Sequence, residues 1–500
     1  MHNHNKITLS LPVSAWLLLI TVFSGIVINI VVNILPLSLE EKLIISFAFV
    51  IIAYSQIFLT LKILYKNVKF IHIFLLLTIP FSYGQHFIAM FDRDYLFQNQ
   101  DYHILDGLLA DSSIINASFF IILFLILLTF GYIIVNKQES YSQEMITREE
   151  KTTDKILLFV GLLFLAISFI PAFKEVLGQY NLSKTYSYLA RRNLEHESNY
   201  FQLLGISSRD TYLAEWFLPS LYMILISLKT KRARVIPYFI LLGYSSIYLL
   251  TGSRFILLKM AMVVFLIEYF WHHSFSKQAL KKIFILALPL AIVFSVMTKL
   301  RGTTDYNYAS IADGLANYFK SSPLNSTLWE TGITFTSVSN VIDKVPNSLP
   351  FFAGKSYLGA VLILLPAFLR FGFTERYTFT ISSTLSPLYY RSKLFGYGSS
   401  IYAEQYYNFG YLSLIIAIFI GMMFGYFERK VHQNSFKHKS SSFLIYSFIL
   451  GELIYSVRND LYAIPRVTFI SLGIPLIVVW FIRELINKSM YHKGDNQEVS

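Results

Sequence analysis

Long apolar runs, separated by short polar connections, constrain the fold of this 500-residue chain more than any other feature. Residues 13–35 and 114–135 are examples, and each run has about 17–25 residues, the length that a helix needs to cross a bilayer. Hydrophobic residues make up 55% of the sequence and charged residues 14%, which excludes a soluble globular protein. Only helices and closed barrels satisfy their backbone hydrogen bonds in lipid. The sequence therefore predicts an all-α polytopic integral membrane protein.

The apolar runs predict about twelve transmembrane helices. Basic residues cluster in alternate connections, such as residues 62–69, 229–234 and 429–439, and the connections between them are acidic or mixed. Since basic connections face the cytoplasm, we expect both termini to be cytoplasmic. The expected spans are residues 13–35, 43–63, 70–90, 114–135, 156–173, 211–228, 235–251, 254–271, 283–300, 409–427, 443–458 and 467–482.

The whole chain, residues 1–500, is expected to form one membrane domain with two long extracytoplasmic segments. The first covers residues 174–210 and the second residues 301–408. Connections of this length in a compact protein are usually functional. The second contains an apolar stretch, residues 357–371, which Pro366 interrupts. Counting this stretch as a span would reverse the topology of the later loops, so we expect an interfacial or re-entrant helix there.

Charge and cysteine content narrow the function further. The net charge of +12 lies largely in short loops beside spans, where it meets anionic lipid and gives no reason to expect a nucleic-acid partner. The absence of cysteine excludes disulfides and thiol catalysis. The first apolar run is too long for a signal peptide and lacks a small-residue cleavage site, so we expect it to remain as a span.

Arginine is concentrated in the expected outer loops, whereas lysine predominates in the inner loops. Bacterial topology selects against basic residues outside, and arginine is the residue that binds phosphate bidentately. The distribution therefore predicts an anionic, phosphate-bearing substrate at the outer face. The outer arginines are Arg191, Arg192, Arg209, Arg254, Arg301, Arg370, Arg376, Arg391, Arg458 and Arg466.

A T-G-S-R sequence opens the expected eighth span. Gly252 lets the backbone come close to a ligand, Ser253 can cap the helix, and Arg254 adds a forked donor. A helix N-terminus of this kind suits a phosphate group. A tight turn whose arginine reaches toward lipid headgroups explains the residues equally well.

An A-E-Q-Y-Y-N-F-G sequence leads from the long loop into the tenth span. A helix here would place Glu404, Tyr407 or Asn408, and Tyr411 on one face. The carboxylate could act as a general base toward a sugar hydroxyl, and the aromatic rings could stack on the sugar. An interfacial tyrosine belt explains the tyrosines but not the glutamate and asparagine.

An R-N-D-L-Y sequence begins the short outer turn between the last two spans. The turn can hold Arg458 and Asp460 rigidly, either for a ligand or merely as a pair with each other. Pro465 is expected to break the helix just before Arg466, which would start the final span.

Two further charge patterns are ambiguous. Lys259 and Glu452 lie within expected spans, where charges are costly, and can serve function or pair with each other. The Asp92-Arg93-Asp94 triplet matches the paired acids of some metal-dependent glycosyltransferases, but it is too short to indicate a metal site. We therefore expect no metal and no other cofactor.

These motifs together resemble the Wzy-type oligosaccharide repeat-unit polymerases of O-antigen and capsule assembly, mainly over residues 250–466. The resemblance implies transfer of a growing glycan chain between undecaprenyl-diphosphate carriers at the outer face of the cytoplasmic membrane. A flippase and a chain-length regulator would be its partners. The large outer loop is shared with O-antigen ligases, but these typically use an outer-loop histidine, which is not evident here.

The resemblance and the residue chemistry assign the same roles. Glu404, with Asp460 as second choice, would act as base toward the acceptor hydroxyl. Direct displacement by that hydroxyl would invert the anomeric centre. The alternatives are another polyprenyl-phosphate glycosyltransferase, an O-antigen ligase, or a twelve-span secondary transporter. The diphosphate-binding set is Gly252, Ser253, Arg254, Arg301, Arg458 and Arg466, and the sugar-binding set is Tyr407, Asn408 and Tyr462.

Overall fold

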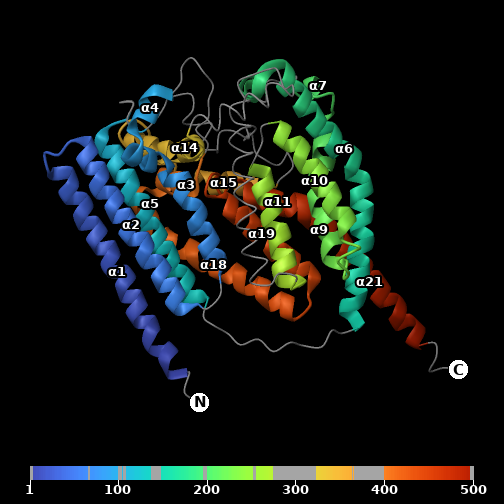
Figure 1. The fold of residues 1–500 in the computed structure, drawn as a ribbon. Coiled ribbons are helices and arrows are strands. Elements are labelled where there is room, and N and C mark those ends of the chain that lie inside the picture. The colour runs from blue at the N-terminus through green and yellow to red at the C-terminus, as the bar shows by residue number, and fades with distance from the viewer. Residues whose placement is uncertain are drawn as a thin grey trace. The chain divides into compact units, whose positions relative to one another are not determined.

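The computed structural model describes residues 4–65, 68–99, 104, 109–136, 148–194, 200–251, 255–273, 322–362, 364 and 399–495. Within these ranges the chain is helical and contains no β-strand, as the apolar runs predict (Figure 1). Seven helical segments are long and apolar enough to cross a membrane, and two shorter apolar helices accompany them. The count of twelve spans stays a prediction, and the expected span 283–300 lies outside the described residues.

The chain divides into two compact units. The first unit comprises residues 1–140, 322–429 and 453–463, and the second comprises residues 141–321, 430–452 and 464–500. The described helices that begin in the first unit are α1 (His4–Ile34), α2 (Leu39–Leu64), α3 (Phe70–Phe91), α4 (Arg93–Asn99), α5 (Asp111–Val135), α14 (Pro323–Lys344), α15 (Lys355–Leu362), α17 (Ile401–Phe409), the 3₁₀ turn Gly410–Leu412, α18 (Ser413–Phe436), which continues into the second unit, and α20 (Ala463–Arg466), of which only the first residue lies in the first unit.

The described helices that begin in the second unit are α6 (Arg148–Leu194), α7 (Tyr200–Leu203), α8 (Ser208–Ala214), α9 (Phe217–Ser227), α10 (Val235–Leu250), α11 (Phe255–Leu266), the π-helix Ile267–Trp271, α19 (Ser440–Tyr455), whose last three residues lie in the first unit, the π-helix Val467–Gly473 and α21 (Ile474–Asp495).

Helix α5 forms the centre of the first unit and packs against α1, α2, α3 and α14. Its crossing with α18 depends on two glycines: a Cβ at Gly131 would lie 1.9 Å from the Ile418 carbonyl oxygen, and one at Gly421 would lie 1.8 Å from that of Leu128. No real side chain tolerates such distances, so the two backbones touch only because both residues lack a side chain.

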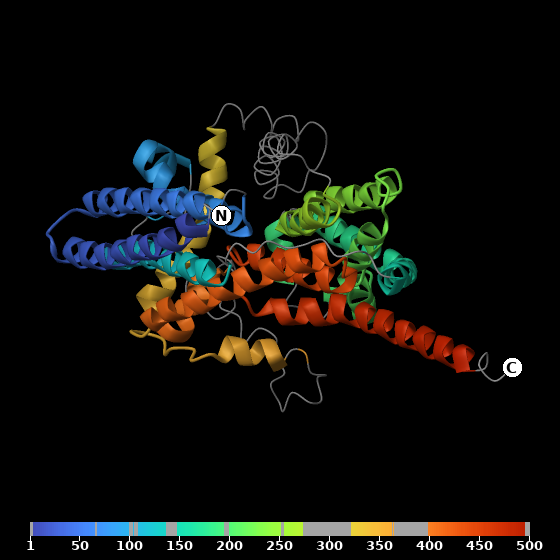
Figure 2. The same cartoon turned by 90° about the horizontal axis from the view of Figure 1, so that it is seen from below.

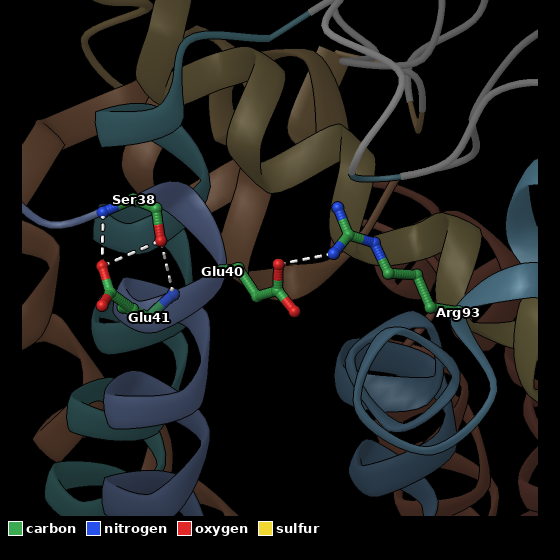
Figure 3. A network of polar contacts seen from close by, with 4 residues as sticks. All are labelled: Ser38, Glu40, Glu41 and Arg93. Atoms are coloured by element: carbon green, nitrogen blue, oxygen red, sulfur yellow. Dashed lines mark hydrogen bonds and ion pairs between the residues drawn. The ribbon is translucent and has the colours of Figure 1, made fainter.

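The N-terminus of α2 shows how local sequence fixes a helix start. The Ser38 hydroxyl accepts from the Glu41 N–H at 3.3 Å, and the Glu41 carboxylate accepts from the Ser38 N–H at 2.8 Å (Figure 3). This capping box satisfies donors that the helix itself leaves free. Beside it, Arg93 forms an ion pair of 2.5 Å with Glu40. Because both side chains are about half exposed, the pair adds at most about 1 kcal/mol.

Helix α14 is an element that the sequence did not predict. It lies within the expected loop 301–408, and it runs across the direction of α1, α2 and α5 (Figure 2). It packs mainly on α3, where Gly84 and Gly332 allow a close crossing. In Figure 1 both α14 and α4 lie at the end of the first unit opposite the N-terminus. The first part of the expected interfacial helix 357–371 is α15, and residues 365–371 lie outside the described ranges.

Two expectations about the second unit need correction. Helix α6 continues through Pro171 to Leu194, so residues 174–194 of the expected first loop are helical. The expected break before Arg466 is also wrong, because helix begins at Ala463 and continues into the π-helix. Pro465 is tolerated there because the missing N–H falls in the first turn, where helix donors have no intrahelical partner.

Candidate active site

Helix α17 carries the candidate base and is buried along its length. The Ser400 hydroxyl caps it by accepting from the Ala403 N–H at 3.2 Å, and Gly410, at φ +56°, ends it. Residues 401–408 are all buried, although six of the eight are polar or are tyrosines with a hydroxyl group. The helix predicted from the A-E-Q-Y-Y-N-F-G sequence is thus present, and its polar side chains face protein interior.

Glu404 is fully buried, with 0% of its surface exposed. Its Oε2 accepts a hydrogen bond of 2.6 Å from the backbone N–H of Leu461. Its Oε1 has no hydrogen-bond partner among the described residues. The Ser356 hydroxyl lies beside the carboxylate. An oxygen without a regular hydrogen-bond partner can accept a proton from a hydroxyl that reaches it.

The turn between α19 and α20 is attached to α17 at two points. The Ile401 N–H donates to the Ser456 carbonyl at 2.9 Å, and the Leu461 N–H donates to Glu404. These bonds place Asp460, which is 5% exposed, close enough to interact electrostatically with Glu404. Buried pairs of carboxyl groups are typical of sites that move protons. The turn also carries Arg458, so three of the predicted site residues come together in the first unit.

Asn408 joins the segment before α15 to α17. Its Oδ1 accepts from the Gly354 N–H at 2.8 Å, and its Nδ2 donates to the Ser356 hydroxyl at 2.9 Å and to the Glu404 carbonyl at 2.8 Å. The Phe352 N–H also donates to the Tyr407 carbonyl at 2.8 Å. The predicted sugar ligand Asn408 therefore has its amide engaged by protein, and it holds Ser356 beside the Glu404 carboxylate.

Two polar side chains extend the site beyond Glu404. Tyr357 of α15 lies next to Gln405 of α17, and neither the tyrosine hydroxyl nor either amide atom makes a regular hydrogen bond among the described residues. Burial and, second to it, the nearby Glu404 carboxylate raise the pKa of the Tyr357 hydroxyl above its usual range. The hydroxyl therefore stays protonated and available as a donor.

The aromatic residues occupy different positions from those that the helix face predicts. Tyr407 stacks on Phe352, with 4.8 Å between ring centroids and 6° between ring planes. Tyr462 is 4% exposed and packs against Ala360. Tyr411 does not share a face with Glu404, because Gly410 ends α17 first, and its ring meets Phe120 and Tyr406. The expected placement of Tyr411 is therefore wrong.

Arg466 belongs to the second unit and is already bound by protein. Its Nη2 donates to Glu215 at 2.6 Å, and its guanidinium lies 5.9 Å from the centre of the Tyr212 ring. The other oxygen of Glu215 accepts from the Ser471 hydroxyl at 3.3 Å. Arg466 can therefore bind a diphosphate only by exchanging this carboxylate for it. The remaining predicted phosphate ligands, Gly252, Ser253, Arg254 and Arg301, lie outside the described residues.

The other charge patterns also have partners. Lys259 and Glu452 form an ion pair within the second unit, as one of the two interpretations expected. Asp92 accepts from the Asn325 amide at 2.5 Å, and Arg93 binds Glu40. Among the described residues no cluster of three metal-ligating side chains occurs.

Several site residues were not evident in the sequence. Ser356, Tyr357 and the Leu461 N–H reach Glu404 only through the fold, and no spacing in the sequence links them. Gln405 directly follows Glu404 in the motif, and this adjacency was the one feature of the sequence that could have indicated a site residue.

Comparison with known proteins places the chain in a family. The family model described as O-antigen polysaccharide polymerase Wzy matches residues 15–490, nearly the whole chain. No curated protein and no solved structure matches. The match therefore extends the resemblance seen in residues 250–466 to both units, and it favours the polymerase over the ligase and the transporter. The chain belongs to the O-antigen polysaccharide polymerase Wzy family.

Proposed function

We propose that this protein transfers a growing glycan chain from one undecaprenyl diphosphate to a single repeat unit held on another, at the outer face of the bacterial cytoplasmic (inner) membrane. Family membership supports repeat-unit polymerisation. The observation that carries the catalytic assignment is Glu404, buried and held through one oxygen by the turn that bears Arg458 and Asp460. The flippase that delivers repeat units and the chain-length regulator are the expected partners.

In the proposed reaction, a hydroxyl oxygen of the acceptor sugar attacks the anomeric carbon of the growing chain. The bond from that carbon to the diphosphate oxygen breaks, and the diphosphate leaves with the electron pair. Oε1 of Glu404 takes the hydroxyl proton, and Asp460 lies beside it to share the proton or its charge. A single displacement of this kind inverts the anomeric centre.

Positive charge at the leaving group is the second requirement. Arg458 lies in the turn that holds Glu404, and its forked guanidinium suits a diphosphate. Arg254, Arg301 and Arg466, with Gly252 and Ser253, are the further proposed ligands. Preorganised charge of this kind is often the largest catalytic contribution, so the proposal needs no metal ion. The outer location rests on the loop charges, and α14 and α4 lie opposite the expected cytoplasmic N-terminus (Figure 1).

Deletion of the gene tests the function directly. The cell's surface glycans, separated by electrophoresis, should change from a ladder to a band with a single repeat unit, and the wild-type gene should restore the ladder. If the gene encoded a ligase, its deletion would instead leave long polymer attached to the lipid carrier. An unchanged ladder would contradict the proposal and return attention to transport.

A further inference from the structure

Helix α14 is buried although much of it is polar. Besides one glutamate, six of its hydroxyl- or amide-bearing residues are less than 9% exposed, namely Ser326, Thr334, Thr336, Ser337, Ser339 and Asn340. Buried polar groups in proteins are almost always hydrogen-bonded to protein, water or ligand. Each of these side chains is therefore expected to have a partner.

Part of the polar surface is satisfied within the protein. The Ser337 hydroxyl donates to the Thr334 carbonyl at 2.7 Å, and Asp343 accepts from the Ser113 hydroxyl at 3.1 Å. The other groups differ: the hydroxyls of Thr336 and Ser339, and both amide atoms of Asn340, have no hydrogen-bond partner among the described residues. Leaving such groups unpaired costs folding free energy, so water or a ligand is expected to satisfy them.

The unpaired groups share one face of the helix. Gly332, Thr336 and Asn340 follow one another at intervals of four residues, and Ser339 lies next to them. The row spans roughly 12 Å at 1.5 Å per residue. At its start, Gly332 contacts Gln85 of α3, since a Cβ at the glycine would lie 2.6 Å from the backbone nitrogen of Gln85 and 3.0 Å from its Cγ.

Gln85 adds a donor to this row. Its Oε1 accepts from the Ile104 N–H at 3.1 Å, whereas its Nε2 has no partner in the described part of the chain. Next to it, His86 and Phe335 form an aromatic wall, with 4.4 Å between ring centroids. Glutamine, threonine, serine and asparagine on one surface, beside aromatic rings, give mixed donors and acceptors without net charge.

We propose that these buried polar side chains of Gln85, Thr336, Ser339 and Asn340, here called the sugar surface, bind hydroxyl groups of the oligosaccharide repeat unit. An uncharged surface of mixed donors and acceptors suits neutral sugars, whereas a diphosphate needs arginine or lysine. Helix α14 also packs on α17, the helix of Glu404. The inference rests on the proposed function for the identity of the glycan, and it assigns sugar binding to a surface distinct from Tyr407, Asn408 and Tyr462.

Two shape-conserving variants, Asn340→Leu and Thr336→Val, test the sugar surface. Because each replaces an unpaired polar group by an apolar one of similar size, the purified protein should be as thermally stable as the wild type. The substrate is the lipid-linked repeat unit extracted from the deletion strain. We expect its KM to rise about 10-fold or more for each variant, because a sugar group loses its partner, with kcat largely kept. Ser337→Ala is the matched control, since that hydroxyl is already bonded within α14.

The outcomes separate this inference from the catalytic assignment. A wild-type KM in stable Asn340→Leu and Thr336→Val proteins would mean that only water occupies the surface. Loss of stability in both variants would mean that the groups have structural partners, and either result overturns the inference. If the deletion strain keeps its ladder, stabilisation of the purified protein by the delipidated glycan of that strain still tests binding. If Glu404→Gln is active while KM still rises in these variants, the base assignment fails and the sugar surface stands.

Discussion

At the residue scale, the site shows which roles depend on chemistry and which on position. The sequence placed Glu404, Arg458 and Asp460 in one predicted site, and the fold joins α17, which carries Glu404, to the turn that carries the other two through the Leu461 N–H; their roles stay a prediction. It assigned Asn408 to sugar, yet each end of that amide is engaged by backbone or by Ser356. Such bonds depend on residues more than 50 positions away along the chain, and local spacing contains no information about them.

Asn408 is therefore expected to act through position. Asn408→Ala removes the partner of the half-buried Gly354 N–H and the donor that the buried Ser356 hydroxyl accepts from, at about 1–3 kcal/mol for each group. We expect a lower unfolding midpoint in detergent and a reduced kcat with KM nearly unchanged. Asn347→Ala, which removes an exposed amide, serves as control. A stable Asn408→Ala enzyme with a raised KM would restore direct sugar binding.

Arg458 offers a test of bidentate phosphate binding. Arg458→Lys keeps the charge but loses the planar fork, so polymer synthesis should fall at least several-fold, and Arg458→Ala should abolish it. Both proteins should insert and accumulate normally, as checked by immunoblotting of membranes. Wild-type synthesis in the lysine variant would show that charge alone is sufficient at this position.

At the element scale, apolar helices were predictable and polar ones were not. Helices α2, α3, α5 and α10 begin and end within a few residues of the expected spans, because hydrophobic length alone defines them. Helix α14 was missed because its serine, threonine and asparagine content is that of a loop. Its packing on α3, α5 and α17 explains why it is buried, and Gly84 and Gly332 allow the close approach to α3.

The crossing of α5 and α18 yields a stability prediction. Gly421→Ala would place a methyl group 1.8 Å from the Leu128 carbonyl oxygen, so the helices must separate. We expect a loss of roughly 1–3 kcal/mol or more, measured as a lower thermal midpoint of the purified protein. Gly243→Ala of α10 is the control, because its Cβ would contact nothing within 4 Å, and it should gain about 0.5–1 kcal/mol. Equal thermal midpoints for Gly421→Ala and the wild type would show that the two helices can separate at this crossing without loss of stability.

At the scale of the whole molecule, the composition was sufficient to predict a membrane protein but not to predict how its helices are organised into units. The hydrophobic residues are gathered in runs of span length, and the seven long apolar helices that they form indicate a multi-pass membrane protein. The division into two units, each built from three separate stretches of sequence, depends on long-range packing that no local pattern records. Within the first unit, α17 packs beside the turn that carries Arg458, although the turn lies some 50 residues later in the sequence. This contact creates the candidate site.

The charge-based mechanism makes a prediction for the complete protein. If arginines stabilise the diphosphate, polymerisation by the purified enzyme should continue after extensive treatment with EDTA, measured as the length distribution of lipid-linked glycan. A metal-dependent glycosyltransferase treated in parallel confirms that chelation is effective. Activity lost with EDTA and recovered with a divalent cation would instead direct attention to Asp92 and Asp94.

The most direct test of the central claim compares wild-type enzyme with Glu404→Gln in liposomes that contain lipid-linked repeat units. Glutamine keeps the shape of the side chain and can still accept from the Leu461 N–H, but it cannot take a proton. We expect the rate of polymer formation to fall roughly 10²–10⁴-fold, while the protein stays folded and still binds its substrate. Polymer formed at the wild-type rate would contradict the assignment of Glu404 as the base.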